Sequence, residues 1–382
     1  MKVTNKVQPL LYVLTKGTWG GAQRYVFDLC VYAKEQGLEP VLAYGESGLL
    51  VERLTRIGVR CIRVPGLARD ISLVSDIRAF FSLAALFLKE HPKVVHLNSS
   101  KASALGALAA KITNVPHTVF TAHGWAFTEK RSLLAKVFFY LVHAVTLILA
   151  DTTIAVSEAI MKSAPLRPLV RHKLMVIRNG IAHTPSSYSK AAARTVLIAR
   201  FPFLSKVQQE LWVVTLGELH DNKGIDIGIE AWKNVAHKDA QWCIIGGGER
   251  ESRLKTQAED VPSIHFLGFI ENAAELLPAF DCMLLPSRTE ALAYVLLEAG
   301  VAHLPVIATN VGGVPEIVRN DVSGILIEKE NPRSCEQALR TLLSDEEKRA
   351  SFGASLHAHV TKHFSLTRMC EATLACYGTK PH

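Results

Sequence analysis

The chain has 382 residues, of which 49% are apolar and 20% are charged, and its formal net charge is +8. At about 150 residues per domain this length corresponds to two domains, and the apolar content excludes an intrinsically disordered chain. The seven cysteines are scattered, odd in number and never spaced C-x-x-C. That pattern argues against a disulfide framework or a zinc site and favours a reducing compartment.

The positive charge is unevenly distributed along the chain. Residues 1–182 contain 23 Lys and Arg against 11 Asp and Glu, a net charge of +12, whereas residues 183–382 contain 20 against 24, a net charge of −4. Halves of opposite charge predict different partners for each. The basic excess would suit nucleic acid, but no nucleic-acid-binding motif accompanies it, so we expect no nucleic-acid partner.

The first half of the chain alternates short apolar runs with stretches of helical length. Runs typical of strands lie at residues 10–15, 41–44, 60–64, 94–97, 118–121, 153–156 and 175–177. Residues 72–89 have a helical period, with apolar side chains on one side at Ile77, Phe80, Phe81, Ala84 and Leu88. Strands separated by helices predict a parallel sheet that is covered on both faces.

Residues 183–207, rich in Pro and Ser, interrupt this alternation, which then resumes with strands at 211–216, 241–245, 264–267, 282–285 and 306–308. We therefore predict an N-terminal domain over 1–185, a linker over 186–208 and a second domain over 209–362. A C-terminal helix over 363–382 is expected to return to the first domain. Two doubly wound α/β domains make a cleft, where ligands of this class usually bind.

The longest uncharged apolar run, residues 137–150, is fourteen residues long. A membrane span needs roughly 20 such residues, so the run is predicted to be a core helix rather than a membrane contact. The apolar run at 10–14 is too short for a signal-peptide core. We expect a soluble or peripheral protein.

Three glycine turns each follow an apolar run and precede a stretch of helical length. They are Gly20-Gly21 in T-W-G-G-A-Q, residues 246–248 in I-I-G-G-G-E and residues 312–313 in V-G-G-V-P-E. Glycine permits close backbone approach, and a helix N-terminus offers N–H groups to a diphosphate or a sugar hydroxyl. Taken singly, each is explained at least as well by a tight structural turn, and the first lacks the G-x-G-x-x-G pattern of dinucleotide-binding proteins.

Three charged side chains accompany the strands of the second half. Lys223, in G-E-L-H-D-N-K-G, is placed to neutralise a leaving diphosphate, although a solvated surface lysine fits the pattern too. Glu290 and Glu298 lie in an apolar segment, Glu290 at the start of a helix predicted over 291–302 and Glu298 more than two turns inside it. Sugar or ribose hydroxyls would satisfy such carboxylates. Their separation of about 12 Å along a helix is too long for a glycosidase pair, which needs about 5–9.5 Å. A capping Glu290 and an ion-paired Glu298 are the structural alternatives.

Taken in order, these motifs resemble glycosyltransferase family 4. They are G-G-A-Q, G-x-L-x-x-x-K-G, I-I-G-G-G-E, E-x7-E and P-V-I-A-T-x-V-G-G-V-P-E, densest over 211–324. The resemblance implies an α/β GT-B fold of two Rossmann-like domains with a cleft between them. It also implies retaining, metal-independent transfer from a nucleotide sugar. The match is looser over 38–150, where such enzymes bind their varied acceptors.

The resemblance also implies catalytic residues. Gly20 and Gly21 would face the donor diphosphate and the acceptor. His123, in T-A-H-G-W, would line the donor sugar. Lys223 would bind the diphosphate, and Glu290 would contact hydroxyls of the transferred sugar.

The remaining donor contacts that the resemblance implies lie in the second half. The backbone N–H groups of Ala291 and Leu292 would lie near phosphate, and Glu298 would hold the ribose hydroxyls. Phe269 and Ile270 would lie beside the nucleobase. No cofactor and no metal ligand are expected.

The chain departs from the family pattern at Glu218, where the family usually has arginine. Unit charges about 4 Å apart interact by roughly 4 kcal/mol at an effective dielectric of 20, so a glutamate cannot take the arginine's place beside phosphate. We hypothesise that Glu218 turns away and that Lys223, helix N-termini and, as a candidate, Arg288 hold the diphosphate. The family's E-G-F-G is also changed, by residues 291–293, which leaves the donor sugar open.

We predict a glycosyltransferase of the hexosyltransferase class. It would move a sugar from a nucleotide-diphosphate donor, a UDP-sugar first, to a hydroxyl of a glycan or lipid-linked acceptor in polysaccharide or glycolipid biosynthesis. A GT-B nucleotide-sugar epimerase and a non-catalytic sugar-nucleotide-binding protein are alternatives, and the missing G-x-G-x-x-G disfavours a nicotinamide oxidoreductase. The basic half predicts an anionic membrane surface or a phosphate-linked lipid acceptor as partner. A cytoplasmic protein is expected, with peripheral attachment to the inner face of the cytoplasmic membrane.

Overall fold

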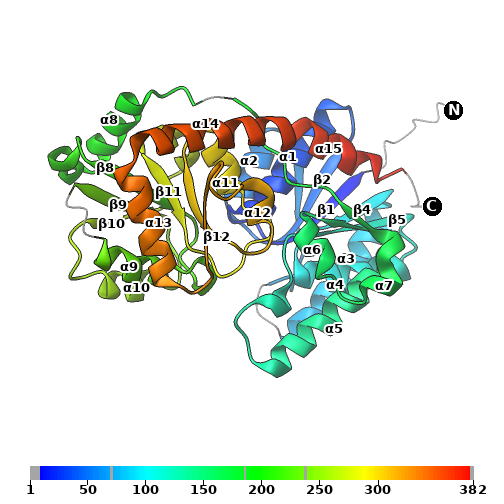
Figure 1. Cartoon of the computed structure of the whole chain (residues 1–382). Coiled ribbons are helices and arrows are strands. Elements are labelled where there is room, and N and C mark those ends of the chain that lie inside the picture. The colour runs from blue at the N-terminus through cyan, green and yellow to red at the C-terminus, as the bar shows by residue number, and fades with distance from the viewer. Residues whose placement is uncertain (1–8, 69–71, 185, 236–238, 379–382) are drawn as a thin grey trace. The chain divides into compact units, whose positions relative to one another are not determined.

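The computed structural model describes residues 9–68, 72–184, 186–235 and 239–378 (Figure 1). The chain divides into two compact units. Unit 1 comprises Met1–Asn179 with Leu366–His382, and unit 2 comprises Gly180–Ser365. Each unit has a parallel sheet with helices on both faces, which is the doubly wound α/β architecture that the alternating sequence predicts.

The sheet of unit 1 has seven parallel strands among the described residues, in the order β3-β2-β1-β4-β5-β6-β7. The strands are β1 Leu10–Lys16, β2 Pro40–Glu46, β3 Arg60–Arg63, β4 Val94–Leu97, β5 His117–Ala122, β6 Thr152–Ala155 and β7 Leu174–Val176. β4, β5 and β6 are buried at every position. A sheet that helices cover on both faces buries every position of its central strands, and here this includes polar residues such as His96, Thr121 and Thr153.

Helices cover both faces of this sheet. They are α1 Gly21–Glu35, α2 Leu49–Arg56, α3 Leu73–Glu90, α4 Ser100–Ile112, η1 Ala126–Thr128, α5 Leu133–Leu149, α6 Glu158–Lys162, α7 Arg167–Val170, η2 Arg171–Lys173 and α15 Leu366–Ala375. The chain runs outward from β1 to β3 through α1 and α2, and then crosses back from β3 to β6 through α3, α4 and α5. Because such crossovers are right-handed, α1 and α2 lie on one face and α3, α4 and α5 on the other. α15 packs against α1 (Figure 1).

A buried polar network holds the C-terminal segment in unit 1. Tyr377 Oη lies 2.7 Å from His96 Nδ1 and 3.2 Å from Tyr12 Oη. His96 Nε2 lies 2.7 Å from Thr121 Oγ1. Burial lowers the pKa of His96 to about 3, so the ring is neutral at pH 7. The segment after residue 365 thus contributes a tyrosine to the core of the first sheet.

The sheet of unit 2 has six parallel strands among the described residues, in the order β10-β9-β8-β11-β12-β13. The strands are β8 Leu211–Leu216, β9 Ala240–Ile245, β10 Ile264–Gly268, β11 Cys282–Leu285, β12 Val306–Thr309 and β13 Gly324–Ile327. The order reverses beside β8, where β9 pairs on one side and β11 on the other. A doubly wound sheet binds ligands beyond the carboxyl ends of its strands at such a reversal.

The helices of unit 2 also form two layers. They are α8 Lys190–Arg200, η3 Pro202–Val207, η4 Asp221–Lys223, α9 Ile225–Asn234, α10 Glu251–Gln257, η5 Ala273–Ala279, α11 Tyr294–Val301, α12 Val314–Ile317, α13 Pro332–Ser344 and α14 Glu346–His363. α13 packs against α9 and α14 against α11. A core around Trp242, Ile229 and Leu339 joins the α9 and α13 layer to the sheet. The helix predicted over 291–302 begins later, at Tyr294, so Glu298 lies little more than one turn inside it.

Residues 186–208 belong to unit 2 and are not the linker that their composition predicts. They form α8 and η3, and α8 packs against η5. Arg194 on α8 stacks over the ring of Trp212 and lies 2.9 Å from Asp281 Oδ2. Proline and serine mark the turns around this short anchored helix, and the division between the units lies at residues 179 and 180 instead.

Helix α5 contains most of the apolar run at 137–150, and it is a core helix on one side only. His143, Ala144 and Leu147 are buried, whereas Leu134 and Leu141 are exposed. Among the described helices, none is long and apolar enough to cross a membrane.

Candidate active site

Four loops meet at the carboxyl edge of the unit 2 sheet. They follow β8, β9, β11 and β12, the strands on either side of the reversal in strand order. The backbone N–H of Leu219, after β8, donates to the carbonyl of Gly247, after β9. The N–H of Arg288, after β11, donates to the carbonyl of Asn222 at 2.7 Å. The loops are therefore fixed to one another by their own backbones, independently of any side chain.

Lys223 and Glu290 meet across the reversal point. Lys223 closes the 3₁₀ turn η4 after β8, and its Nζ lies 2.7 Å from Glu290 Oε1. Ser287 Oγ donates to the same oxygen at 2.7 Å. The Glu290 side chain is only 9% exposed. This carboxylate is thus held by a cation and a hydroxyl in largely dry surroundings, which is how a buried charge is tolerated.

Glycine makes this close approach of loops possible. Gly312, after β12, has φ +53°, and a Cβ there would lie 1.6 Å from the carbonyl oxygen of Glu290. The N–H of Gly313 donates to that same carbonyl. Gly246 has φ +141°, and its Cβ would lie 1.9 Å from the carbonyl oxygen of Gly217. Glycine is therefore required at these two turns, because a side chain there would clash with the backbone of the neighbouring loop.

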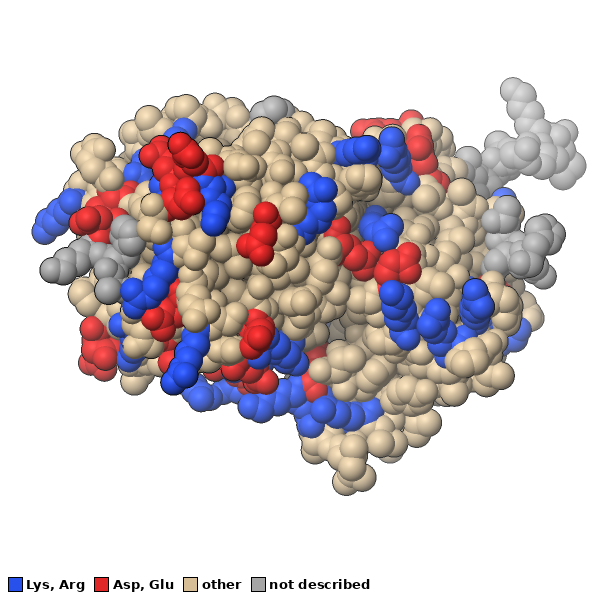
Figure 2. Space-filling model, viewed as in Figure 1, with Lys and Arg blue, Asp and Glu red and all other residues tan. Residues whose placement is uncertain are grey.

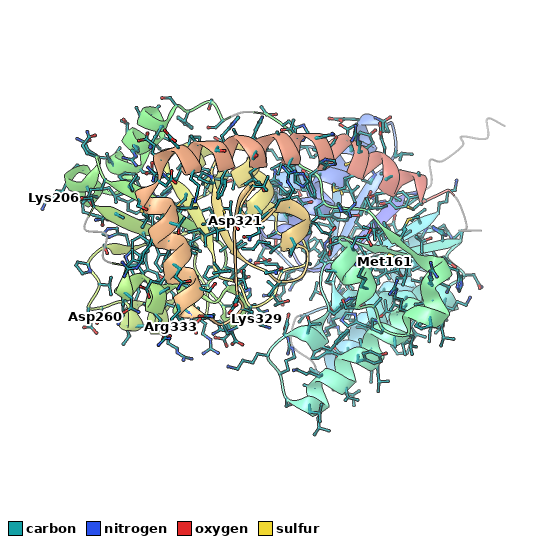
Figure 3. The ribbon with its side chains drawn as sticks, viewed as in Figure 1. Met161, Lys206, Asp260, Asp321, Lys329 and Arg333 are labelled. Atoms are coloured by element: carbon teal, nitrogen blue, oxygen red, sulfur yellow. The ribbon has the colours of Figure 1, made fainter. Side chains whose placement is uncertain are left out.

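We hypothesised that Arg288 holds the diphosphate, but its guanidinium is already bound to two carboxylates. Its guanidinium makes two bonds to Asp226, at 2.8 and 2.7 Å, and a third to Glu330 at 3.0 Å. Burial alone would raise the pKa of Asp226, but hydrogen bonds from Arg288 hold it below its usual value. Glu330 lies in the sequence between Lys329 and Arg333, which Figure 3 labels near the start of α13. Arg288 is a structural cation whose charge is already compensated.

Glu218 points into solvent. The residue is exposed, and within the described ranges it forms no ion pair, whether with Lys223 or with another cation. Arg250, which follows the 246–248 glycines, forms an ion pair with Asp221 in the loop after β8. The position occupied by arginine in the family pattern thus carries an outward glutamate, and the cation beside this loop comes from the neighbouring loop.

The other predicted donor contacts lie on the same edge of unit 2. Phe269 is 58% exposed directly after β10, whereas Ile270 is 5% exposed. Only the first of these side chains can therefore present a face to a nucleobase. Ala291 is partly exposed, Leu292 is buried, and Glu298 is partly exposed on α11. Gly268, just before Phe269, accepts a hydrogen bond from the N–H of Gly246 at 2.9 Å, which ties this loop to the glycine turn.

The unit 1 sheet has its own reversal point, between β1 and β4. Gly20 and Gly21 are exposed at the N-terminus of α1, a fifteen-residue helix. Ser99, after β4, bonds to Thr15 at the end of β1 through their hydroxyls at 2.8 Å. The polar residues that follow β1 and β4 and the open end of α1 therefore gather at this edge, where an anion would meet helix N–H groups.

His123 lies after β5, next to this reversal point. Its Nε2 lies 3.3 Å from Asn98 Oδ1, and its ring stands edge-on to Tyr25, with centroids 4.9 Å apart. Asn98 Nδ2 donates to a backbone carbonyl, so its oxygen faces the histidine and accepts from Nε2–H. Burial lowers the pKa of His123 to about 3. His123 is therefore a neutral imidazole with Nδ1 as an acceptor, and not a cation.

Several residues of these sites were not predicted from the sequence. Asn98 and Ser99 directly follow the β4 strand, at the point where the strand order reverses, and that rule would have selected them. Ser287 stands three residues before Glu290, but α11 begins only at Tyr294, so this S-x-x-E spacing is not a capping box and gave no signal of the contact. Tyr25 carried no signal of its own. Among the described residues, no group of three or more His, Cys, Asp or Glu is placed to hold a metal ion.

Two family models together match most of the chain. The model described as Glycosyltransferase Family 4 matches residues 19–184, and the one described as Glycosyl transferases group 1 matches residues 200–356. Among curated relatives, an Escherichia coli protein is 28% identical over 91% of this chain and 90% of its own length. Its name is UDP-Gal:alpha-D-GlcNAc-diphosphoundecaprenol alpha-1,3-galactosyltransferase. The Staphylococcus aureus capsular polysaccharide biosynthesis glycosyltransferase CapM is 24% identical, over 81% of this chain and 83% of its own.

Solved structures agree with the GT-B fold. Anabaena HepE in complex with UDP and glucose superposes with a TM-score of 0.83 at 18% identity, over 97% of this chain and 98% of that one. A sucrose-phosphate synthase from Thermosynechococcus elongatus has a TM-score of 0.81 at 19% identity, with the same coverage. Matched by glycosyltransferase models in both units and by relatives along most of its length, the chain belongs to glycosyltransferase family 4 and is a GT-B glycosyltransferase.

Proposed function

We propose that this enzyme transfers a hexose from a UDP-sugar, with retention and without a metal ion, to a hydroxyl of a glycan or lipid-linked acceptor. The pathway would be polysaccharide or glycolipid assembly. The observation that carries the proposal is the Lys223–Glu290 pair at the reversal point of the unit 2 sheet, with both partners largely buried. The pair places a cation that can bind a diphosphate beside a carboxylate that can bind sugar hydroxyls. A nucleotide sugar is a single donor that has both a diphosphate and sugar hydroxyls.

The relatives support the choice of donor and acceptor. The Escherichia coli relative is named for UDP-galactose and for a diphosphoundecaprenol-linked acceptor, and HepE was solved with UDP and glucose. The exposed ring of Phe269 offers a stacking face for a uracil. UDP-galactose and UDP-glucose are therefore the donors to test first.

The proposed chemistry needs no group beyond donor, acceptor and chain. The bond between the sugar C1 and the β-phosphate oxygen breaks, and the UDP leaving group takes the electron pair. The acceptor oxygen bonds to C1 on the same face, and its proton moves to a β-phosphate oxygen. Lys223 and the loop N–H groups would stabilise the charge that develops on the diphosphate, which is the largest source of catalysis in such steps. Neutral His123 would hydrogen-bond to the sugar.

Retention and metal independence are tested on the product and with a chelator. Incubation with UDP-galactose or UDP-glucose and a GlcNAc-diphospholipid should give a disaccharide lipid. Its anomeric proton coupling in NMR should match the α-configuration of the donor. Transfer should persist in EDTA. A β-linked product, or activity that EDTA abolishes and Mg²⁺ or Mn²⁺ restores, would refute that part of the proposal.

A matched assay separates transfer from the alternatives. The epimerase would release a free sugar nucleotide of altered configuration and make no glycosidic bond, which chromatography of the sugar nucleotides detects. A non-catalytic binding protein would bind the donor in calorimetry and turn over none of it. Glu290→Ala should bind UDP yet form no disaccharide. Activity near wild type in this variant would contradict the assignment of Glu290 as a catalytic residue.

A further inference from the structure

Exposed apolar side chains concentrate on one layer of unit 1. Of the 21 large apolar side chains that are exposed in the described part of the chain, 15 belong to α3, α4 and α5. These three helices cover the same face of the sheet, and α4 packs against both neighbours. Exposed apolar residues scattered singly are ordinary, but a continuous patch marks an interaction surface. We call the outer side of these helices the α3–α5 apolar face.

The exposed residues of α5 form a stripe at helical spacing. The stripe consists of Leu134, Val137, Phe138, Leu141, Val145 and Ile148. Leu134, near the first turn, is 83% exposed. The opposite side of the helix is buried against the rest of unit 1. A helix that is apolar all round belongs in a buried environment, and this one has such an environment on a single side.

Helix α3 repeats the arrangement. Leu73, Val74, Ile77, Phe81 and Leu88 lie on its outer side, and Phe81 is 65% exposed. The inner side is packed through Leu83 and Phe87. Between the two stripes, α4 exposes Leu108 and Ile112, so the apolar surface continues from one stripe to the other. Figure 3 shows side chains projecting outward along α5, and over α5 the surface in Figure 2 is largely uncharged.

Basic residues border this face. Residues 101–173 contain nine Lys and Arg against three Asp and Glu, a net charge of +6, which is half of the +12 found over 1–182. Lys111, Lys130 and Lys136 are exposed, and none forms an ion pair with a described residue. Figure 2 shows further Lys and Arg side chains over the region of α6 and α7, where Figure 3 labels Met161. α5 itself contains one charged residue, Lys136.

We propose that the α3–α5 apolar face docks on an anionic lipid bilayer, with its outer side chains in the interfacial region and the basic border against lipid phosphates. An apolar surface bordered by lysine and arginine matches the two layers of such a membrane, hydrocarbon below and negative charge above. A second copy of the chain is the less favourable occupant, because a self-contact would bring two positive borders together. Docking of this kind would hold the enzyme at the surface where a lipid-linked acceptor lies.

Flotation with vesicles tests the proposal on the full-length protein. Wild type should float with phosphatidylcholine vesicles that contain about one third phosphatidylglycerol, and not with pure phosphatidylcholine. Raising the salt from about 0.1 M to about 0.5 M, which shortens the screening length, should weaken the binding. Leu134→Asp combined with Phe138→Asp should lower the vesicle partition coefficient at least about tenfold, because two apolar side chains are lost from the interface.

Matched variants keep the result interpretable. Val322→Asp replaces another exposed apolar residue, in unit 2, and should float like wild type. Lys130→Glu with Lys136→Glu should weaken binding to anionic vesicles and flatten its salt dependence. Thermal unfolding verifies that each variant is folded, since all five positions are exposed.

Three results would overturn the proposal. They are a wild type that ignores anionic vesicles, a Leu134→Asp/Phe138→Asp variant that floats normally, and a wild-type dimer that this variant converts to monomer without any vesicle binding. UDP-sugar turnover with a short soluble acceptor reports on the function separately. Leu134 and Phe138 lie on the exposed outer side of α5, a helix that contains none of the proposed site residues, so this turnover should survive in the apolar-face variant, and docking and catalysis can fail independently.

Discussion

Lys223 Nζ lies 2.7 Å from Glu290 Oε1, although the two residues are 67 positions apart in the chain and follow different strands of one sheet. A diphosphate that binds Lys223 competes with Glu290 for the same cation. Sugar hydroxyls must then satisfy the carboxylate, because a largely buried charge that loses its partner is costly. The pair therefore couples recognition of the diphosphate to recognition of the sugar.

Glu290→Gln should separate binding of the nucleotide from turnover. Without the carboxylate, Lys223 is left to the phosphates alone, so the affinity for UDP measured by calorimetry should be unchanged or higher. Transfer should fall by at least about a hundredfold in kcat/KM, since the charge that orients the sugar is gone. Weaker UDP binding together with normal turnover would contradict the coupling.

Lys223→Met should weaken UDP binding. A charge-assisted hydrogen bond contributes about 1.5–3 kcal/mol, so the Kd for UDP should rise by about tenfold or more. Lys233→Met is the matched control, because Lys233 in the same unit forms an exposed ion pair with Asp260 (labelled in Figure 3). Equal effects of the two substitutions on UDP affinity would remove Lys223 from the diphosphate site.

Glu218→Arg restores the residue that the family pattern has at this position. Because Glu218 is exposed and makes no ion pair among the described residues, its replacement should leave the fold intact. Donor affinity should be equal or higher, since a cation is added where an anion stood. A large loss of affinity in a donor titration would show that the glutamate has a direct role in binding.

Gly312→Ala should reduce activity through the position of Glu290. Its Cβ would lie 1.6 Å from the Glu290 carbonyl oxygen, at a φ of +53°, so the loop must move. Gly37→Ala, at φ +74° with open space around it, controls for backbone strain, which costs about 1–2 kcal/mol. Both variants should unfold at lower urea concentration, and only Gly312→Ala should lose transfer activity. Full activity in Gly312→Ala would show that this loop adjusts without disturbing the site.

Buried histidines should make the protein less stable in mild acid. Burial lowers the pKa of His96 and of His123 to about 3 and that of His143 to about 4, whereas an unfolded histidine titrates near 6.5. Between these values the unfolded state binds more protons, so stability falls as pH drops below about 6.5 and continues to fall towards pH 3–4. Fully buried His96 alone contributes about 2 kcal/mol of this loss at pH 5.

Urea unfolding at pH 7 and pH 5 measures this effect. His96→Gln should lower stability at pH 7, because the 2.7 Å bonds to Tyr377 and Thr121 are disturbed, and should make the decline towards pH 5 shallower. A wild-type stability that is flat between pH 7 and pH 5 would contradict the low pKa values.

The order of strands and helices could be predicted from the sequence because it depends on local periodicity. Continuous apolar runs such as those in β1 and β11 mark buried parallel strands, and glycine turns followed by helices mark their carboxyl ends. Lys223 and Glu290 were found in this way, as residues that follow strands. The segment at 186–208 was misassigned because its Pro and Ser residues suit a linker and the turns around α8 equally well, and only the contacts of Arg194 distinguish the two.

By itself, the sequence determined the charge division and the positions of the motifs. It did not determine which charges meet. Arg288 is adjacent to the glutamate motif yet binds Asp226 and Glu330, whereas Lys223 reaches Glu290 across a strand reversal. Likewise, the stripe through Ile77 and Phe81 is visible in the sequence as a helical period. Whether that stripe faces the sheet or solvent depends on which side of α3 packs against α4 and the sheet. Pairing between distant residues and the choice of a buried face are properties of the assembled sheet, so only the tertiary structure decided them.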